Sequence, residues 1–354
     1  MKDLDSPALR AWLDERAQQH QFSGVVLVRA GDNTLFEHAS GLAHRGHRVP
    51  LTVDTRFQVA SVGKMITAAT ALRMVEKGAL SLDRPLTGFL PPQYRPASLD
   101  ERHTLHHLLS HTSGLPNYHD DEDETWESWT SALDRVPGPR ARGPLDILPL
   151  FADLPAVTDP GEYIYCDANF ILIGGLIEWV SGMPFAEVAT EEVLTPAGMT
   201  RSGFFQVDLE PEGYAVGYMV TEEPVETWRS NVLSLTAGAM PDGGMTSTAQ
   251  DLDRFLAALR SGRILASETV SLMLTPHGVD EDSPEAYGYG MELVVENDVV
   301  TIYGHGGLDP GVSTMVSHYV EPEVTIVVLC NQDRGSWAVA QRLAEELGLS
   351  DPRE

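Results

Sequence analysis

The chain has 354 residues, which is enough for one large domain or two intertwined ones. It carries 52 acidic against 24 basic residues, a formal charge of -28, and such a surface repels nucleic acid and anionic membranes. We therefore exclude both as partners and expect a small molecule or a short peptide as the ligand.

The cysteine count and the start of the chain bear on the compartment. Cys166 and Cys330 cannot form a disulfide framework. Residues 1–7 lack the apolar core of a secretory signal, and no later run is long enough to span a membrane. The chain as given is therefore expected to be cytoplasmic, and its oligomeric state stays open.

The first elements are a helix and a hairpin. The Ser6-Pro7 pair is typical of a helix N-terminus, and the apolar spacing after it predicts a helix over about 7–19. Two apolar runs at 24–29 and 34–39 predict strands, joined by a short turn with a glycine and an asparagine. A sheet therefore comes early in the chain.

A second helix is expected to start near Ser61. Met65, Ala69 and Leu72 recur at helical spacing, and Gly78 stands where a glycine ends many helices. Ser61 then lies at the N-terminal end of this helix.

The region from about 80 to 260 reads as helices separated by long loops, with little strand character. Its helices are expected at 105–110, 169–180, 184–194 and 249–259. The loop 117–145 is rich in Asp, Glu, Pro and Trp, and loops of that length often cover a site. We expect it to act as a lid.

The tail returns to sheet, so the first and last segments are expected to share one sheet. Strands are predicted at 290–295, 299–304, 313–320 and 324–330, followed by a helix at 336–347. The predicted fold class is α/β (α+β), an antiparallel sheet flanked by helices with an inserted, mostly helical region. Residues 1–60 and 245–354 would form the sheet region, and 61–244 the helical region.

Ser61 and Lys64 are the first candidates for chemistry. Lysine occurs only at positions 2, 64 and 77, so a chain that avoids lysine has placed one beside this serine. At a spacing of three the two side chains project from one helix face, and the helix N-terminus favours negative charge on Oγ. On spacing alone, a capped and solvated helix end explains the pair equally well.

Four later motifs support the chemical interpretation. In chain order the five motifs lie at residues 61–64, 103–115, 160–170, 243–252 and 304–311, and they include Ser61-Val62-Gly63-Lys64, Tyr165-Cys166-Asp167 and His305-Gly306-Gly307. Together they resemble the family of class C β-lactamases, low-molecular-weight penicillin-binding proteins and their esterase relatives. The resemblance covers about 22–335 as a single catalytic unit.

The resemblance implies a role for each matching residue. Ser61 would be the acylated serine and Lys64 its partner, with Tyr165 and Asp167 as the counterparts of the family's Tyr-x-Asn. The strand motif Lys/His-Thr-Gly is matched by His305, Gly306 and Gly307. The backbone N–H groups of Ser61 and of Leu308, the residue after that motif, would form the oxyanion hole.

Asp167 departs from the family's asparagine. A carboxylate cannot donate hydrogen bonds to a substrate carbonyl, and it would pair with Lys64 and hold that lysine charged. The role of base then falls more naturally on Tyr165, whose pKa Lys64 would lower and Asp167 would raise. Which of the two effects dominates stays open at this point.

His305 is the second departure, since many lactamases have lysine there. It is only partly protonated near pH 7, so carboxylate anchoring should be weaker. We therefore predict a serine hydrolase of small esters, amides or short peptides, most simply an esterase or a D-amino-acid-type amidase or peptidase. The alternatives are a D-Ala-D-Ala carboxypeptidase or β-lactamase and, in another class, a non-catalytic member that binds penicillin or peptide.

No cofactor or metal is needed for this chemistry. The cluster of His103, His106, His107 and His111 has spacings that could ligate zinc. Because His107 and His111 fall within the family's His-Leu-Leu-x-His-Thr-Ser-Gly segment, a structural role beside the active site is the better interpretation.

Overall fold

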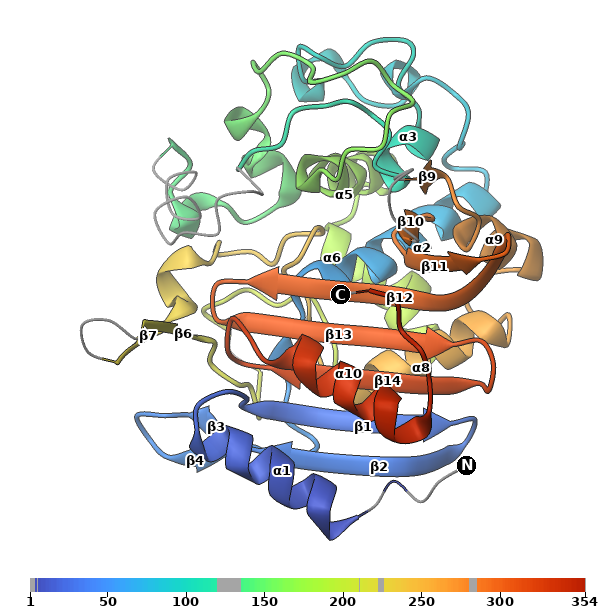
Figure 1. Cartoon of the computed structure of the whole chain (residues 1–354). Helices are drawn as coiled ribbons and strands as arrows, with labels where there is room; N and C mark the ends of the chain where they lie inside the picture. The colour runs from blue at the N-terminus through green and yellow to red at the C-terminus, as the bar shows by residue number, and fades with distance from the viewer. Residues whose placement is uncertain are drawn as a thin grey trace.

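The computed structural model describes residues 4, 6–119, 135–209, 211–221, 226–279 and 285–353. Figure 1 shows a large sheet with helices on both of its faces and a mostly helical region beyond one edge. The sheet has eight antiparallel strands in the order β2-β1-β14-β13-β12-β11-β10-β9. The predicted fold class is confirmed, and the division into residue ranges stays a prediction.

The strand bounds follow from the sheet ladders. The eight strands of the main sheet are β1 (Gly24–Ala30), β2 (Asn33–Ser40), β9 (Gly278–Val279), β10 (Glu285–Tyr287), β11 (Glu292–Glu296), β12 (Val299–Asp309), β13 (Val312–Tyr319) and β14 (Val324–Cys330). Three two-stranded pairs lie outside it, formed by β3 (Leu42–His44) with β4 (Val49–Pro50), β5 (Phe57–Gln58) with β8 (Thr246–Ser247), and β6 (Tyr218–Thr221) with β7 (Thr227–Ser230).

The described helices include the predicted ones. They are α1 (Pro7–Gln18), α2 (Gly63–Glu76), α3 (Leu105–Leu109), α5 (Asp167–Ser181), α6 (Phe185–Ala189), α7 (Thr195–Ala197), α8 (Ala249–Arg260), α9 (Ser267–Met273) and α10 (Ser336–Leu347). A π-helical turn, η7 (Thr190–Leu194), joins α6 to α7. The side chain of Ser6 accepts the N–H of Leu9 at 3.2 Å and caps α1 as predicted.

The first and last strands of the chain lie side by side, as expected, with Gly24 opposite Cys330 and Ala30 opposite Val324. Because side chains alternate across a strand, Val25 and Leu27 enter one hydrophobic cluster while Val26 enters the other. Helices α1 and α10 cover the second cluster, and α2, α5 and α8 contribute to the first. Burial on both faces explains why these strands read as continuous apolar runs.

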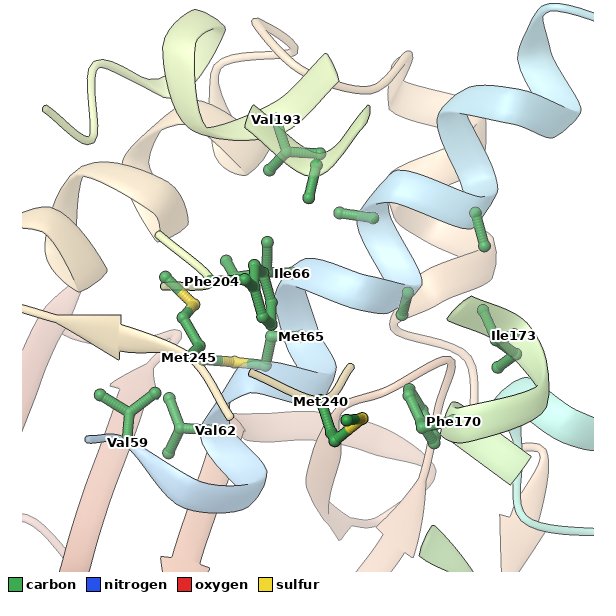
Figure 2. Packing of buried hydrophobic residues seen from close by; sticks show 14 of the residues in the cluster. Val59, Val62, Met65, Ile66, Phe170, Ile173, Val193, Phe204, Met240 and Met245 are labelled. Atoms are coloured by element: carbon green, nitrogen blue, oxygen red, sulfur yellow. The ribbon is translucent and has the colours of Figure 1, made fainter. Parts of the chain in front are cut away.

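Helix α2 runs through the core, and its residues 63–72 are all buried. Figure 2 shows the side chains around its first turns, which come from five separate parts of the chain: Met65 and Ile66 of α2 itself, Phe170 and Ile173 of α5, Val193 of η7, Phe204 of the segment after α7, and Met240 and Met245 of the segment before β8. Gly78 has φ 73° and ends the helix as predicted. The start of α2 is therefore fixed by packing from all sides.

The structure corrects the expected shortage of strands in the middle of the chain. The hairpin of β6 and β7 was missed because its strands are short and stand outside the main sheet. Strand β12 continues to Asp309, whereas the predicted strand ended at 304, because Gly304, Gly306 and Gly307 interrupt the apolar pattern. Residues 120–134 of the predicted lid lie outside the described residues.

Over the described ranges, no single helix is both long and apolar enough to cross a membrane. The helical segments Asp167–Ser181 and Phe185–Ala197 meet the criterion only as a pair, and they are bent by 86° relative to each other.

Candidate active site

Ser61 lies in the short 3-10 turn η1 (Ala60–Val62), directly before α2. Ala60 has φ 48°, a left-handed conformation that costs a residue with a Cβ about 1 kcal/mol. The hydroxyl of Thr314 on β13 donates to the carbonyl of Val59 at 2.9 Å and holds this turn against the sheet. The serine is thus presented by a strained turn at the start of a core helix.

The ammonium of Lys64 uses all of its donors within the protein. Nζ donates to Ser61 Oγ at 2.9 Å and to the backbone carbonyl of Asp242 at 2.8 Å, and it forms an ion pair with Asp167 Oδ1. Burial opposes the charge, but the carboxylates of Asp167 and Asp242 outweigh burial and raise the pKa of Lys64. Lys64 is therefore a charged ammonium with no N–H left for a substrate.

Asp167, the first residue of α5, contacts two basic side chains. Its Oδ1 meets Lys64, and its Oδ2 lies 2.8 Å from His119 Nε2. Burial disfavours the carboxylate, yet Lys64 and the hydrogen bond from His119 hold the pKa of Asp167 well below its usual range. The predicted pair of Asp167 and Lys64 is present, and the contact with His119 is an addition that the sequence did not suggest.

Tyr165 lies beside the same two residues. Its ring centre is 5.1 Å from Lys64 Nζ. Burial and the Asp167 carboxylate raise the pKa of Tyr165 well above its ordinary value, and an interaction with the side chain of Ser61 lowers it by less. Burial and Asp167 therefore set the direction of the shift, and the phenol is neutral at rest.

His305 is buried within β12, and both of its ring nitrogens have partners. Nε2 lies 2.8 Å from the hydroxyl of Tyr287, while Nδ1 lies 2.5 Å from the carbonyl of Gly306 and 3.1 Å from Glu292 Oε1. Burial lowers the pKa of His305, and Glu292 offsets only part of that effect. A neutral ring with both nitrogens engaged is a poor anchor for a substrate carboxylate.

The glycines after His305 let β12 pass close to its neighbours. A Cβ on Gly307 would stand 2.4 Å from the hydroxyl of Thr314 and 2.6 Å from the carbonyl of Val59. A Cβ on Gly306 would stand 2.8 Å from the ring of Trp337. The motif therefore brings β12 against the turn that carries Ser61. The roles of Ser61 and Leu308 as oxyanion donors stay predictions.

The histidine cluster has local partners. His111 Nδ1 accepts the N–H of Cys166 at 3.0 Å, and burial keeps the pKa of His111 well below its ordinary value, so the ring is neutral. The other three contact nearby groups: His103 the carbonyl of Ser113, His106 the hydroxyl of Tyr289, and His107 the N–H of Thr104. In the part of the chain that the structure describes, no three His, Cys, Asp or Glu side chains are arranged to hold a metal ion. His111 instead supports the segment that carries Tyr165 and Asp167.

A cleft of about 350 Å³ brings the predicted site residues together. Its lining contains all eight of them: Ser61, Lys64, Tyr165, Asp167, His305, Gly306, Gly307 and Leu308. The same cleft is also lined by five residues that were not among the predicted site residues: Tyr118, His119, Asp242, Glu292 and Asp309. Two of them had a signal, since Asp242 directly precedes the Gly243-Gly244 motif and Asp309 directly follows Leu308.

A mixed fold with an antiparallel sheet and a serine–lysine pair in one cleft defines a hydrolytic enzyme of the serine β-lactamase fold. The chain belongs to the Beta-lactamase family, whose sequence profile matches residues 9–349.

Three similar proteins illustrate the range of this family. Esterase EstB of Burkholderia gladioli is 32% identical over 76% of this chain and 74% of its own length. A D-aminopeptidase of Brucella anthropi is 27% identical over 99% of this chain and 64% of its own length. The crystal structure of a penicillin-binding protein from Bacillus halodurans has a TM-score of 0.86 and 34% identity, covering 95% of this chain and 99% of that one. The predicted family and enzyme class are confirmed.

Proposed function

We propose that the chain is an esterase or a D-amino-acid-type amidase or peptidase that works through an acyl-enzyme on Ser61. The observation that supports it most is the bond from Lys64 Nζ to Ser61 Oγ at 2.9 Å, within a cleft large enough for a small substrate. Similarity to an esterase and to a D-aminopeptidase agrees with both substrate types.

The proposed reaction has two stages. Ser61 Oγ attacks the acyl carbon while the N–H groups of Ser61 and Leu308 stabilise the oxyanion, and the leaving alcohol or amine departs with the proton that Oγ gave up. Water then attacks the acyl-enzyme, and its proton returns to Ser61 as the acid is released.

The charge state at rest bears on the identity of the base. Lys64 is charged and Tyr165 is neutral, so each must lose a proton before it can accept that of Ser61. Lys64 and Asp167 stabilise each other as an ion pair, which raises the pKa of Lys64 and lowers that of Asp167 and so opposes loss of the Lys64 proton. The initial preference for Tyr165 as the base is therefore kept as a proposal, with Lys64 as a fixed positive charge beside Ser61 and as the alternative base.

The alternative of a β-lactamase or D-Ala-D-Ala carboxypeptidase has less support. Such substrates carry a carboxylate, and neither Lys64 nor His305 has a donor free to bind one. We expect slow hydrolysis of a chromogenic cephalosporin compared with a short-chain p-nitrophenyl ester.

One experiment tests the proposal against a non-catalytic, ligand-binding role. Intact-mass measurement after treatment with a fluorophosphonate should show one covalent adduct on the wild-type enzyme and none on Ser61→Ala. The rate of adduct formation by Tyr165→Phe should stay near that of the wild type if Lys64 is the base, and fall at least about 100-fold if Tyr165 is. An unmodified wild-type protein with no esterase activity would refute the proposal.

A further inference from the structure

The cleft contains more carboxylates than its chemistry uses. Besides Asp167, which pairs with Lys64, the lining includes Asp242, Asp309 and Glu292. Asp242 is buried, and Asp309 and Glu292 are partly buried. Such a surplus is unusual, because an unpaired carboxylate loses hydration as it is enclosed.

Asp309 and Asp242 lie next to each other beside the nucleophile. Asp309 ends β12, one residue after Leu308, and its Oδ2 would lie 3.5 Å from a Cβ on Gly243, the residue that follows Asp242. The backbone carbonyl of Asp242 accepts a hydrogen bond from Lys64, so this segment stands against the reacting serine.

The basic side chains that line the cleft either have partners within the protein or are neutral. The three donors of Lys64 go to Ser61, the Asp242 carbonyl and Asp167, and His305 is neutral. His119 contacts Asp167. Among the described residues that line the cleft, no basic side chain is therefore left to pair with Asp309.

Asp309 differs from Asp242 and Glu292, because each of those two carboxylates accepts a hydrogen bond within the protein. Asp242 accepts the hydroxyl of Tyr118, and Glu292 accepts the N–H of Gly306 at 2.8 Å. Among the described residues Asp309 has neither a hydrogen bond nor an ion pair to its side chain. Burial and the charges of Asp167 and Asp242 raise the pKa of Asp309 to about 7, a cost that an incoming cation would relieve.

The position of Asp309 says where on the substrate such a cation would be. The acyl oxygen is expected at the N–H of Leu308, and the next Cα along the strand is about 3.8 Å away. A charged group on the carbon next to the acyl carbon would therefore be within reach of the Asp309 side chain.

We propose that Asp309, assisted by Asp242, is a specificity-determining residue that receives an ammonium group on the acyl part of the substrate, as in an α-aminoacyl ester or amide. This inference rests on the proposed function and narrows it to substrates with a free amine beside the scissile bond. Acyl groups with a carboxylate in that position are repelled by the same residues.

The test compares substrates that differ only in the amine. Alanine methyl ester, as both enantiomers, and methyl propionate share one carbon skeleton, so a difference in kcat/KM reports the ammonium. We expect the better alanine enantiomer to exceed methyl propionate by at least about 10-fold in the wild-type enzyme. Asp309→Asn should reduce that ratio about 10-fold or more, and because it is a ratio it does not depend on the active fraction.

The matched control is Asp298→Asn. It makes the same charge change on an exposed turn at the other end of β12, where asparagine tolerates the φ of 64°. This control should keep the wild-type ratio.

The outcomes separate this inference from the proposed function. A wild-type ratio near one, or a ratio that Asp309→Asn leaves unchanged, overturns the role of Asp309 while hydrolysis of p-nitrophenyl acetate through Ser61 still supports the serine hydrolase. If the enzyme hydrolyses p-nitrophenyl acetate but neither alanine ester, the role of Asp309 is likewise overturned and the serine hydrolase is still supported. Absence of any adduct on Ser61 overturns both.

Discussion

Two aspartates in one cleft have opposite character. Asp167 contacts Lys64 and His119, which hold its pKa well below the usual range, whereas Asp309 has no such partner and its pKa is raised to about 7. Their side chains are chemically the same, so the difference comes from the neighbours alone. A carboxylate that is paired within the protein, such as Asp167, can take part in the reaction. An unpaired carboxylate, such as Asp309, can instead bind a cationic group of a ligand.

The largest effect should come from removing the partner of Asp167. Lys64→Met leaves that carboxylate buried without its cation and removes the donor to Ser61 Oγ. We expect kcat/KM for p-nitrophenyl acetate to fall about 1000-fold or more. Steady-state kinetics would show it, with Lys77→Met as the control, since Lys77 is about half exposed and its surface pair with Glu192 contributes little. Activity within tenfold of the wild type would exclude Lys64 from the mechanism.

A smaller effect should follow from neutralising Asp167 itself. Its carboxylate raises the pKa of both Lys64 and Tyr165, and whichever is the base must be deprotonated for acylation. In Asp167→Asn both pKa values fall, so the acidic limb of the kcat/KM profile should move to lower pH by about one unit or more. A profile measured from pH 5 to 10 checks this, and a limb that stays in place or moves to higher pH would contradict the assigned influence of Asp167.

The smallest effect concerns stability, and here the two aspartates should differ in sign. Because the pKa of Asp309 rises from 3.8 to about 7 on folding, the folded state binds more protons than the unfolded state between these values, and stability is lost as the pH rises through them. Asp309→Asn should therefore raise the free energy of unfolding by about 1 kcal/mol at pH 8, with a smaller gain at pH 5. Asp167→Asn should lower it, since Lys64 would lose its counterion.

Urea denaturation at the two pH values distinguishes these cases. Asp298→Asn, at an exposed position, serves as the neutral comparison for both variants. If Asp309→Asn is less stable than the wild type at pH 8, the Asp309 carboxylate has a stabilising partner in the free enzyme. The contrast between Asp309 and Asp167 would then not hold.

The main strands and helix α1 were predictable because the sequence patterns that indicate them lie within the elements themselves. The apolar runs of β1 and β14 and the capped start of α1 give their bounds to within one residue, since burial on both sheet faces and a serine cap leave clear patterns. Strand β12 was cut short because glycines carry no hydrophobic signal, although Gly307 is required there by close packing. Short edge pairs such as β6 with β7 leave no such pattern.

The same distinction applies to the candidate site, where residues within local motifs were predictable and residues placed by long-range packing were not. Residues within recognisable motifs, such as Ser61, Lys64 and Tyr165, were found from the sequence and do line one cleft. His119 and Glu292 were not, because their positions depend on how distant segments pack. The direction of the pKa shift of Tyr165 also needed the structure, since its largest cause is burial, which depends on how distant segments enclose the ring.

The burial of helix α2 has a consequence for how such an enzyme can change. Ser61 and Lys64 are attached to a helix whose residues 63–72 are all enclosed, so any shift of this pair requires the core to repack. Asp309 and the neighbouring turn lie at the end of a strand instead. New substrate preferences should therefore arise in laboratory evolution from substitutions around residues 234–242 and 308–310, with the reacting pair inherited unchanged.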